Sequence, residues 1–331
     1  MKNQTTVTEF ILLGFSATKR LEPLIFASFC ITYTIALLGN LVIITLVWCD
    51  HSLHSPMYIF IANLSFLETL YTTTVIPKML VNFMNQRKSI SSQNCILQAY
   101  FYFSAGSSEF FLLAVMSFDR YIAICNPLRY TAIMNTSFCI KLLAASWMWG
   151  YFVVITPTTL LGQLKFCGPN TINHFFCDVD PLLKLACSDT RTIEIINFVN
   201  SALLLLGSLL VTGISYIFII ATVIHIPSAK GRQKAFSTCA SHLIVVILFY
   251  GSSIFIYVQP QNSHSLDLNK VASILNTVIT PLLNPFIYSL RNKQVKEALT
   301  HFTSKKISPL LNIKVLKRGN ASLHCMRVET K

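Results

Sequence analysis

The sequence carries little charge for its length. Lys, Arg, Asp and Glu together supply 12% of the 331 residues, whereas hydrophobic residues supply 53% and the mean hydropathy is +0.58. This apolar surface exceeds what one soluble core could hide. The scarcity of charge therefore argues against a soluble protein and makes a membrane protein the leading class.

Charge is almost absent from seven apolar runs, each long enough to cross the hydrocarbon core of a bilayer. Their approximate spans are 24–49, 57–77, 95–118, 142–164, 195–224, 236–259 and 271–290. Lipid offers no partner to an unpaired backbone amide, and the runs are too uniformly apolar for barrel strands, so each must be helical. Because the runs show no internal repeat or inverted halves, we expect one all-α bundle of seven transmembrane helices.

The N-terminus lacks the apolar stretch of a cleavable secretory signal, since it reads "MKNQTTVTEF". We therefore expect the first span to insert as an uncleaved signal, with residues 1–23 extracellular, 24–290 forming the seven-transmembrane domain and 291–331 forming a cytoplasmic tail. This orientation places sixteen of the 26 Lys and Arg residues inside. Ten of the sixteen lie in the tail, however, and the loops alone show no inside excess of positive charge.

The net charge of +13 does not predict nucleic-acid binding. The basic residues are spread over loops and tail instead of gathering on one folded face. Contact with the anionic lipids of the cytoplasmic leaflet explains them more simply. Past the last span, "RNKQVKEALTHF" places Val295, Leu299 and Phe302 on one side of a helix. This pattern predicts a short amphipathic helix on the membrane surface.

The ten cysteines divide by the predicted topology. Cys95, Cys167, Cys177 and Cys187 fall on the outer side, where an oxidising compartment permits disulfides, and four cysteines allow three pairings. The other six lie in the membrane or on the reducing side, and their spacing matches no zinc site. We expect these six to be free thiols: Cys30, Cys49, Cys125, Cys139, Cys239 and Cys325. No metal site or cofactor is predicted.

Four N-x-S/T sequons occur in the sequence, and topology separates them. Asn63 lies within a span, and Asn135 and Asn320 are cytoplasmic in this orientation. The predicted glycosylation site is therefore Asn3, in "NQT".

Charges at or inside the spans need an explanation because an unpaired charge in lipid is costly. Arg120 directly follows Asp119 at the inner end of the third span, so it should pair with Asp119 or reach water. An ordinary helix-end ion pair, worth about 0 to 1 kcal/mol when exposed, is one interpretation. Glu68 and Glu109 lie deep within spans. If they face each other, they could hold a sodium ion or share a proton, or form a protonated pair without an ion.

Several motifs together indicate a family. "GN" at Gly39-Asn40, "DRY" at Asp119-Arg120-Tyr121, Trp147 and "NPFIY" at 284–288 occur in the order seen in rhodopsin-like G-protein-coupled receptors. More specifically, the chain resembles the olfactory (odorant) receptors over nearly all of residues 10–300. The matching segments are "LHSPMYIFIANLSFLE", "MSFDRYIAICNPLRY", "SY" at Ser215-Tyr216, "KAFSTCASHL" and "PLLNPFIYSLRN".

The resemblance implies two disulfides and an activation switch. It pairs Cys95 with Cys177 and leaves Cys167 for Cys187. In the implied switch, Arg120 is held by Asp119 at rest and turns toward Tyr216 and the G-protein when the sixth span moves outward. The full switch set is Asp119, Arg120, Tyr121, Tyr216, His242, Asn284, Pro285 and Tyr288. Pro285 kinks its helix and supplies a hinge, and for His242 a polar contact to neighbouring spans is favoured over metal binding.

The resemblance also places Glu68 and Glu109 in the sodium-site region, although most rhodopsin-like receptors have Asp where this chain has Glu68. It places the ligand between the outer halves of spans three, five, six and seven. The implied ligand set is Tyr102, Phe103, Gly106, Ser107, Asn200, Ser253, Ile254, Tyr257 and Thr277. None of these is charged. Tyr102 stands where amine receptors carry Asp, and span seven lacks the Lys that a retinal Schiff base needs. Such a pocket suits a small neutral volatile molecule.

The resemblance implies a multi-pass plasma-membrane receptor, expected in the cilia of olfactory sensory neurons. It binds an odorant, couples to a stimulatory, olfactory-type heterotrimeric G-protein to raise cyclic AMP, and is not an enzyme. One alternative is a rhodopsin-like receptor for a non-odorant small metabolite. A transporter or channel is disfavoured because the spans lack repeat symmetry and a chain of polar residues across the bilayer.

Overall fold

Seven long helical elements form one bundle in the computed structural model, which describes residues 7–15, 21–85, 88–167, 169–258, 265–291 and 294–301. The first six elements are α1 (Glu22–Cys49), α2 (Pro56–Met84), α3 (Ser92–Cys125), α5 (Thr136–Gln163), α7 (Arg191–Ile224) and α8 (Ala229–Val258). The seventh consists of α9 (Ser265–Ile274), a π-helical turn (Leu275–Ile279) and α10 (Thr280–Arg291). Six of the seven are apolar and long enough to cross a membrane, and α8 carries a shorter apolar stretch, Cys239–Phe255. The predicted seven-helix fold is confirmed.

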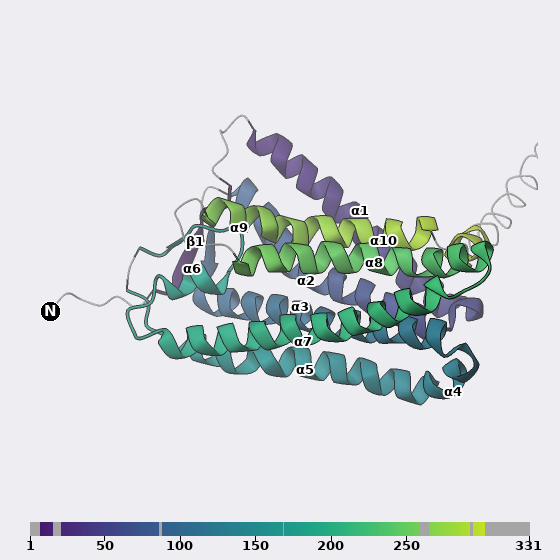
Figure 1. The fold of residues 1–331 in the computed structure, drawn as a ribbon. Helices are drawn as coiled ribbons and strands as arrows, with labels where there is room; N and C mark the ends of the chain where they lie inside the picture. The colour runs from purple at the N-terminus through teal and green to yellow at the C-terminus, as the bar shows by residue number, and fades with distance from the viewer. Residues whose placement is uncertain are drawn as a thin grey trace, which may run out of the picture.

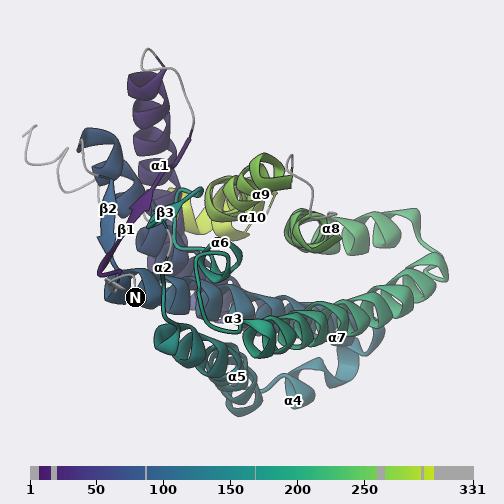
Figure 2. The same ribbon diagram turned by 90° about the vertical axis from the view of Figure 1, so that its left-hand side faces the viewer.

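α3 is the central helix of the bundle. Figure 2 looks onto the outer end and shows α3 beside α2, α5 and α7, all of which pack against it. α1 packs against α2 and α10, and its first turns lean away from the other helices (Figure 1). Small residues allow the close approach of α3 to α5. A Cβ atom added to Gly150 on α5 would lie 2.1 Å from Ser108 Oγ on α3, so only glycine fits at this crossing.

The helices are longer than the predicted apolar spans. α2 continues through Pro77, where the predicted span ends, as far as Met84, and the backbone N–H of Asn85 still donates to Val81 O at 3.1 Å. α8 begins at Ala229, before its apolar stretch, because its first turns carry basic residues that suit the cytoplasmic surface. Hydropathy marks only the part of a helix inside the hydrocarbon, whereas the backbone hydrogen bonds continue beyond it.

A small sheet at the outer end was not predicted. It consists of β1 (Glu9–Leu12), β2 (Ser89–Ser91) and β3 (Thr171–Ile172), in the order β2-β1-β3. β1 runs antiparallel to β2 and parallel to β3. Phe10 and Leu12 of β1 are buried together with Ile172 and the Cys95 and Cys177 side chains. The N-terminal segment is thereby fixed to two outer loops.

Short helical segments occupy the loops and the end of the bundle. On the cytoplasmic side, a 3-10 helix (Pro127–Arg129) leads into α4 (Tyr130–Ile133), and α6 (Val179–Leu183) lies in the long outer loop. Residues 294–301 are helical, in agreement with the predicted surface helix. The buried residues of this helix are Val295 and Ala298, whereas Leu299 is exposed and Phe302 lies outside the described residues. The predicted apolar face is thus shifted: Ala298, not Leu299, follows Val295 into the interior.

Candidate functional site

The predicted ligand residues Tyr102 and Thr277 meet in the outer half of the bundle. The Tyr102 hydroxyl on α3 and Thr277 Oγ1 on the π-helical turn are 2.9 Å apart and share a hydrogen bond. Thr277 is fully buried. π-helical turns interrupt the regular spacing of a helix and recur at functional sites, and this one carries the residue that contacts α3. The bond links the third and seventh helical elements directly.

Three aromatic rings pack against the ring of Tyr102. The Tyr102 ring centroid lies 5.2 Å from that of Phe103 and 4.6 Å from that of Phe176, and Tyr71 contacts it edge-on at 6.1 Å. Phe176 reaches this position because the next residue, Cys177, is tied to α3 by a disulfide. The Tyr102 ring is therefore packed among aromatic side chains, and its hydroxyl meets the buried Thr277.

The other predicted ligand residues have varied surroundings. Ser107 is buried on α3, and a Cβ atom added to Gly106 would meet nothing within 4 Å. Asn200 turns toward α5, where its Nδ2 donates to Val153 O at 3.1 Å. Ser253 donates to the Phe249 carbonyl of its own helix at 2.8 Å. The structure therefore does not join Asn200 and Ser253 to the Tyr102–Thr277 pair by hydrogen bonds.

Two further predicted ligand residues lie on α8. Ile254 is 38% exposed, and the Tyr257 side chain lies outside the described part of the structure. A contact missed from the sequence occurs nearby, where Ser252 Oγ donates to Asn276 Oδ1. This bond joins α8 to the π-helical turn, next to Thr277.

The outer end of the seventh element carries a lysine. The membrane-spanning part of this element begins at Asn269, slightly earlier than predicted, and so includes Lys270. Lys270 is buried and its Nζ donates to Asn173 Oδ1 of the outer loop at 2.7 Å. The predicted absence of a lysine holds for residues 271–290 but not for this outer turn, where the ammonium group binds the loop.

A buried polar cluster lies nearer the cytoplasmic side than the Tyr102–Thr277 pair. Glu68 on α2 and Glu109 on α3 are fully buried and close enough for their charges to interact, so the structure brings the two predicted carboxyl groups together. Glu68 accepts a hydrogen bond from Asn284 Nδ2, and Glu109 lies beside Tyr71. Asn40 donates to the Pro281 carbonyl at 3.1 Å and thereby ties α1 to α10. Two buried carboxyl groups this close cannot both be charged cheaply.

The "GN" and "NPFIY" motifs meet where Gly39 and Pro285 form one tight contact between α1 and α10. A Cβ atom added to Gly39 would lie 2.9 Å from Pro285 Cβ, so the two helices touch where the proline interrupts the α10 hydrogen bonds. Tyr288, one turn further along, is buried, and its hydroxyl has no hydrogen-bond partner among the described residues. The inner half of α10 is thus held by packing instead of by hydrogen bonds from Tyr288.

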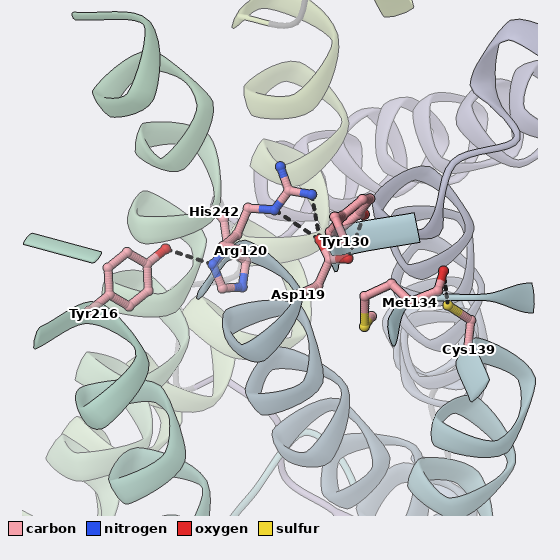
Figure 3. Close-up of polar contacts among 7 residues, drawn as sticks. All are labelled: Asp119, Arg120, Tyr130, Met134, Cys139, Tyr216 and His242. Carbon is pink, nitrogen blue, oxygen red and sulfur yellow. Dashed lines mark hydrogen bonds and ion pairs between the residues drawn. The ribbon is translucent and has the colours of Figure 1, made fainter. Parts of the chain in front are cut away.

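Arg120 and Asp119 form a buried ion pair at the inner end of α3 (Figure 3). Arg120 donates through Nε, 2.9 Å from Asp119 Oδ2, and through Nη2 to the same oxygen. The hydroxyl of Tyr130 on α4 donates to the other carboxylate oxygen, Oδ1, at 2.8 Å. Both oxygens of Asp119 are therefore occupied, and a loop residue holds the ion pair from the cytoplasmic side.

The predicted switch residues Tyr216 and His242 contact each other in this arrangement. The Tyr216 hydroxyl on α7 lies 2.7 Å from His242 Nδ1 on α8, and the two rings are nearly parallel (Figure 3). Both side chains are buried. Tyr121 packs against Tyr216 and Cys239 in a small apolar cluster beside them. Tyr216 is thus bound to the sixth span while Arg120 is bound to Asp119.

The long outer loop is cross-linked and partly buried. The structure joins Cys95 to Cys177 and Cys167 to Cys187, with Cα distances of 5.4 Å and 5.7 Å. Within this loop, burial and a nearby carboxylate, Asp180, raise the pKa of Asp178 to about 7. Burial and the positive charge of Lys270 lower the pKa of His174 to about 3. Asn3, the predicted glycosylation site, lies outside the described residues.

Two important contacts were missed from the sequence. Phe176 could have been found because it directly precedes Cys177, whose implied disulfide to Cys95 places it over the bundle. Tyr130 belongs to the quoted segment "MSFDRYIAICNPLRY", but no sequence pattern indicated that its hydroxyl returns to Asp119. Both contacts depend on how a loop folds back onto α3.

Comparisons with known proteins agree on one family. A family model described as "Olfactory receptor" matches residues 29–306. The chain is 54% identical to mouse "Olfactory receptor 6E1" over 306 residues, which cover 92% of this chain and 98% of that protein. It is 52% identical to human "Olfactory receptor 6X1" over 299 residues, covering 90% of this chain and 96% of that protein. Human "Olfactory receptor 6T1" is also 52% identical, over 298 residues, which cover 90% of this chain and 92% of that protein.

Proposed function

Because this chain belongs to the olfactory receptor family, we propose that it binds a small neutral volatile molecule between the outer halves of its helices and activates a stimulatory, olfactory-type G-protein. Family membership makes it a multi-pass plasma-membrane receptor and not an enzyme. The chemical class of the ligand and the cyclic AMP response are the parts that we propose.

The Tyr102–Thr277 pair is the observation that supports a neutral ligand with one polar group. The Tyr102 hydroxyl and Thr277 Oγ1 place two polar groups side by side, and a hydroxyl group can both donate and accept a hydrogen bond. The surrounding rings of Phe103 and Phe176 would bury the rest of the molecule. A charged ligand would lose its hydration here without gaining a counter-ion, which disfavours it.

The same pair suggests how a ligand bound in the outer half could change the arrangement of the helices at the cytoplasmic side. A ligand that bonds to Tyr102 and Thr277 bridges α3 and the seventh element. α3 carries Arg120 at its inner end, and α10 carries Asn284 and Pro285 beside Glu68. A ligand shifts an equilibrium only by its differential affinity for the two states. We propose that the bridged geometry fits the active arrangement better than the resting one.

Removing each hydroxyl group tests the ligand site. Tyr102→Phe and Thr277→Val should each raise the odorant EC50 by about 2- to 12-fold, the equivalent of a net hydrogen bond of about 0.5 to 1.5 kcal/mol. The double variant should lose less than the sum of the two single losses, because the residues share one site. Thr45→Val is the matched control, since Thr45 only donates to Leu41 O on an exposed helix face. Unaltered EC50 values in both single variants, at equal surface expression, would exclude this pair from the site.

A further inference from the structure

We infer that the side-chain bond between Ser252 and Asn276 holds α8 against the π-helical turn in the resting arrangement, and that α8 bends at Gly251 when this bond opens. α8 packs against α9, the π-helical turn and α10, and the bond crosses this contact. α8 contains the sixth span, which is expected to move outward on activation. The signalling consequence of the inference therefore rests on the proposed function and adds two positioning residues to it.

α8 is weakest where Gly251, Ser252 and Ser253 follow one another. The helix contains no proline, and helices without proline bend sharply at Gly and Ser pairs. Ser252 Oγ lies 2.7 Å from Leu248 O, and Ser253 Oγ donates to Phe249 O at 2.8 Å. Such bonds back to the preceding turn favour bending. A Cβ atom added to Gly251 would meet nothing within 4 Å, so close packing does not require glycine here. Its flexibility is what remains.

The bond to Asn276 joins this weak point to the π-helical turn. Ser252 is buried, so the bond forms away from water. It holds in either orientation of the Asn276 amide, because Oδ1 accepts from the hydroxyl and Nδ2 would donate to it. When the bond opens, the Ser252 hydroxyl still has Leu248 O as a partner in its own helix. Opening therefore leaves only the Asn276 amide without its partner, and α8 can separate from the turn at a modest cost.

The π-helical turn connects this bond to the proposed odorant site. Asn276 bonds to α8, and the next residue, Thr277, bonds to Tyr102 on α3. Consecutive residues of one turn thus contact two different helices. A ligand that bonds to Thr277 changes the position of the turn, and Asn276 must follow because it is the adjacent residue. Binding in the outer half can therefore open the Ser252–Asn276 bond and release α8.

Cys239 reports the position of the inner end of α8. Its side chain is buried and packs against Tyr216, Ile219 and Val223 of α7. When α8 bends outward, this contact opens and the thiol becomes accessible to N-ethylmaleimide. Cys49, at the inner end of α1, is exposed and free, so it serves as a reference within the same molecule. The labelling rate of Cys239 relative to Cys49 therefore measures the opening without a G-protein.

Labelling of the purified full chain in lipid nanodiscs, without odorant and followed by mass spectrometry, tests the inference. Asn276→Ala should raise the relative rate at Cys239 by about 2- to 12-fold, the range for one net hydrogen bond. In a Ser252→Ala background the same change should have no further effect, because the two residues share one bond. Asn63→Ala is the matched control and should leave the rate unchanged, since Asn63 donates to Ile59 O of its own helix.

A second variant tests the bending point and keeps the experiment decisive where Asn276→Ala impairs folding. Gly251→Ala adds a methyl group that meets nothing within 4 Å, so the receptor should fold. It should lower the rate at Cys239 by about two- to fivefold, because alanine stabilises a straight helix relative to glycine. Gly207→Ala on α7 is the matched control, since a Cβ atom added there also meets nothing within 4 Å.

The outcomes separate this inference from the proposed function. Equal rates at Cys239 in the wild type and Asn276→Ala, or a rise that is undiminished in the Ser252→Ala background, would overturn the role of the bond. An unchanged rate in Gly251→Ala would overturn the bending point. A receptor in which Cys239 reports the expected opening, but in which no odorant raises cyclic AMP, would refute the proposed function and leave this inference standing.

Discussion

Removing the hydroxyl of Tyr130 should raise the signalling of the receptor in the absence of odorant. In the structure this hydroxyl donates to Asp119 Oδ1 at 2.8 Å, while Arg120 occupies Oδ2. If Asp119 holds Arg120 in the resting arrangement, Tyr130 helps to fix Asp119. Tyr130→Phe would keep the ring and its packing and remove only this bond.

The size of the effect follows from the chemistry of the bond. Hydrogen bonds to charged groups contribute about 1.5 to 3 kcal/mol, and about 1.4 kcal/mol corresponds to a tenfold change in an equilibrium constant. Tyr130 is only partly buried, so water can partly replace the lost hydroxyl. We therefore expect the lower end of the range, about a tenfold shift of the resting equilibrium toward the active state.

The assay is basal cyclic AMP, normalised to receptor at the cell surface. Tyr33→Phe is the matched control, because Tyr33 also loses a hydroxyl, which contacts Thr73 Oγ1 at 3.1 Å, away from the ion pair. Asp119→Asn should raise basal signalling as well, since it weakens the hold on Arg120. If Asp119→Asn raises basal signalling but Tyr130→Phe leaves it unchanged, Tyr130 does not help to hold Asp119 in the resting state. Unchanged signalling in both variants would refute the proposal that Asp119 holds Arg120 in the resting state.

Two further predictions concern folding. Gly150→Ala should greatly reduce surface expression, because the added Cβ would lie 2.5 Å from the backbone nitrogen of Ser108, which cannot move aside. Gly213→Ala is the control and should be tolerated, since a Cβ atom added there would meet nothing within 4 Å. Equal surface staining of the two variants would contradict the tight α3–α5 crossing. Relative to Asp178→Asn, the wild-type receptor should lose thermal stability as the pH rises from about 4 to 7. Burial and a neighbouring carboxylate raise the pKa of Asp178 from 3.8 to about 7, so the stability present below the unfolded pKa is lost as the pH rises through the folded one. His174, with its pKa lowered from 6.5 to about 3, makes stability rise with pH between those values in both proteins, so the difference between wild type and Asp178→Asn isolates Asp178. A difference that does not change with pH would contradict the role of Asp178.

The spans and the ion pair could be predicted from the sequence because each depends on local information. Hydropathy alone located the seven apolar runs, and the cost of a charge in lipid predicted that Arg120 would either pair with its neighbour Asp119 or reach water. The ends of the helices could not be predicted in this way. α2, for example, passes Pro77 and ends only at Met84.

Contacts between distant segments were harder to predict. β1 pairs with β2 and β3, which lie far along the chain in two different loops, and nothing in the segment "EFIL" specifies those partners. The family resemblance placed Tyr102 and Thr277 in one ligand set but did not predict the hydrogen bond between them. Phe176 was missed because it reaches Tyr102 only through the folding of the outer loop. Asn200 was expected beside the ligand, yet its amide binds Val153 O on α5.

The proposed receptor function is best tested by a cyclic AMP assay in cells that express the full chain with an olfactory G-protein, screened against a chemically broad odorant panel. We expect a dose-dependent rise for at least one neutral odorant, and we expect Arg120→Ala to abolish this rise while the receptor still reaches the surface. A response that Arg120→Ala leaves unchanged, or a ligand-evoked ion flux without a G-protein, would contradict it.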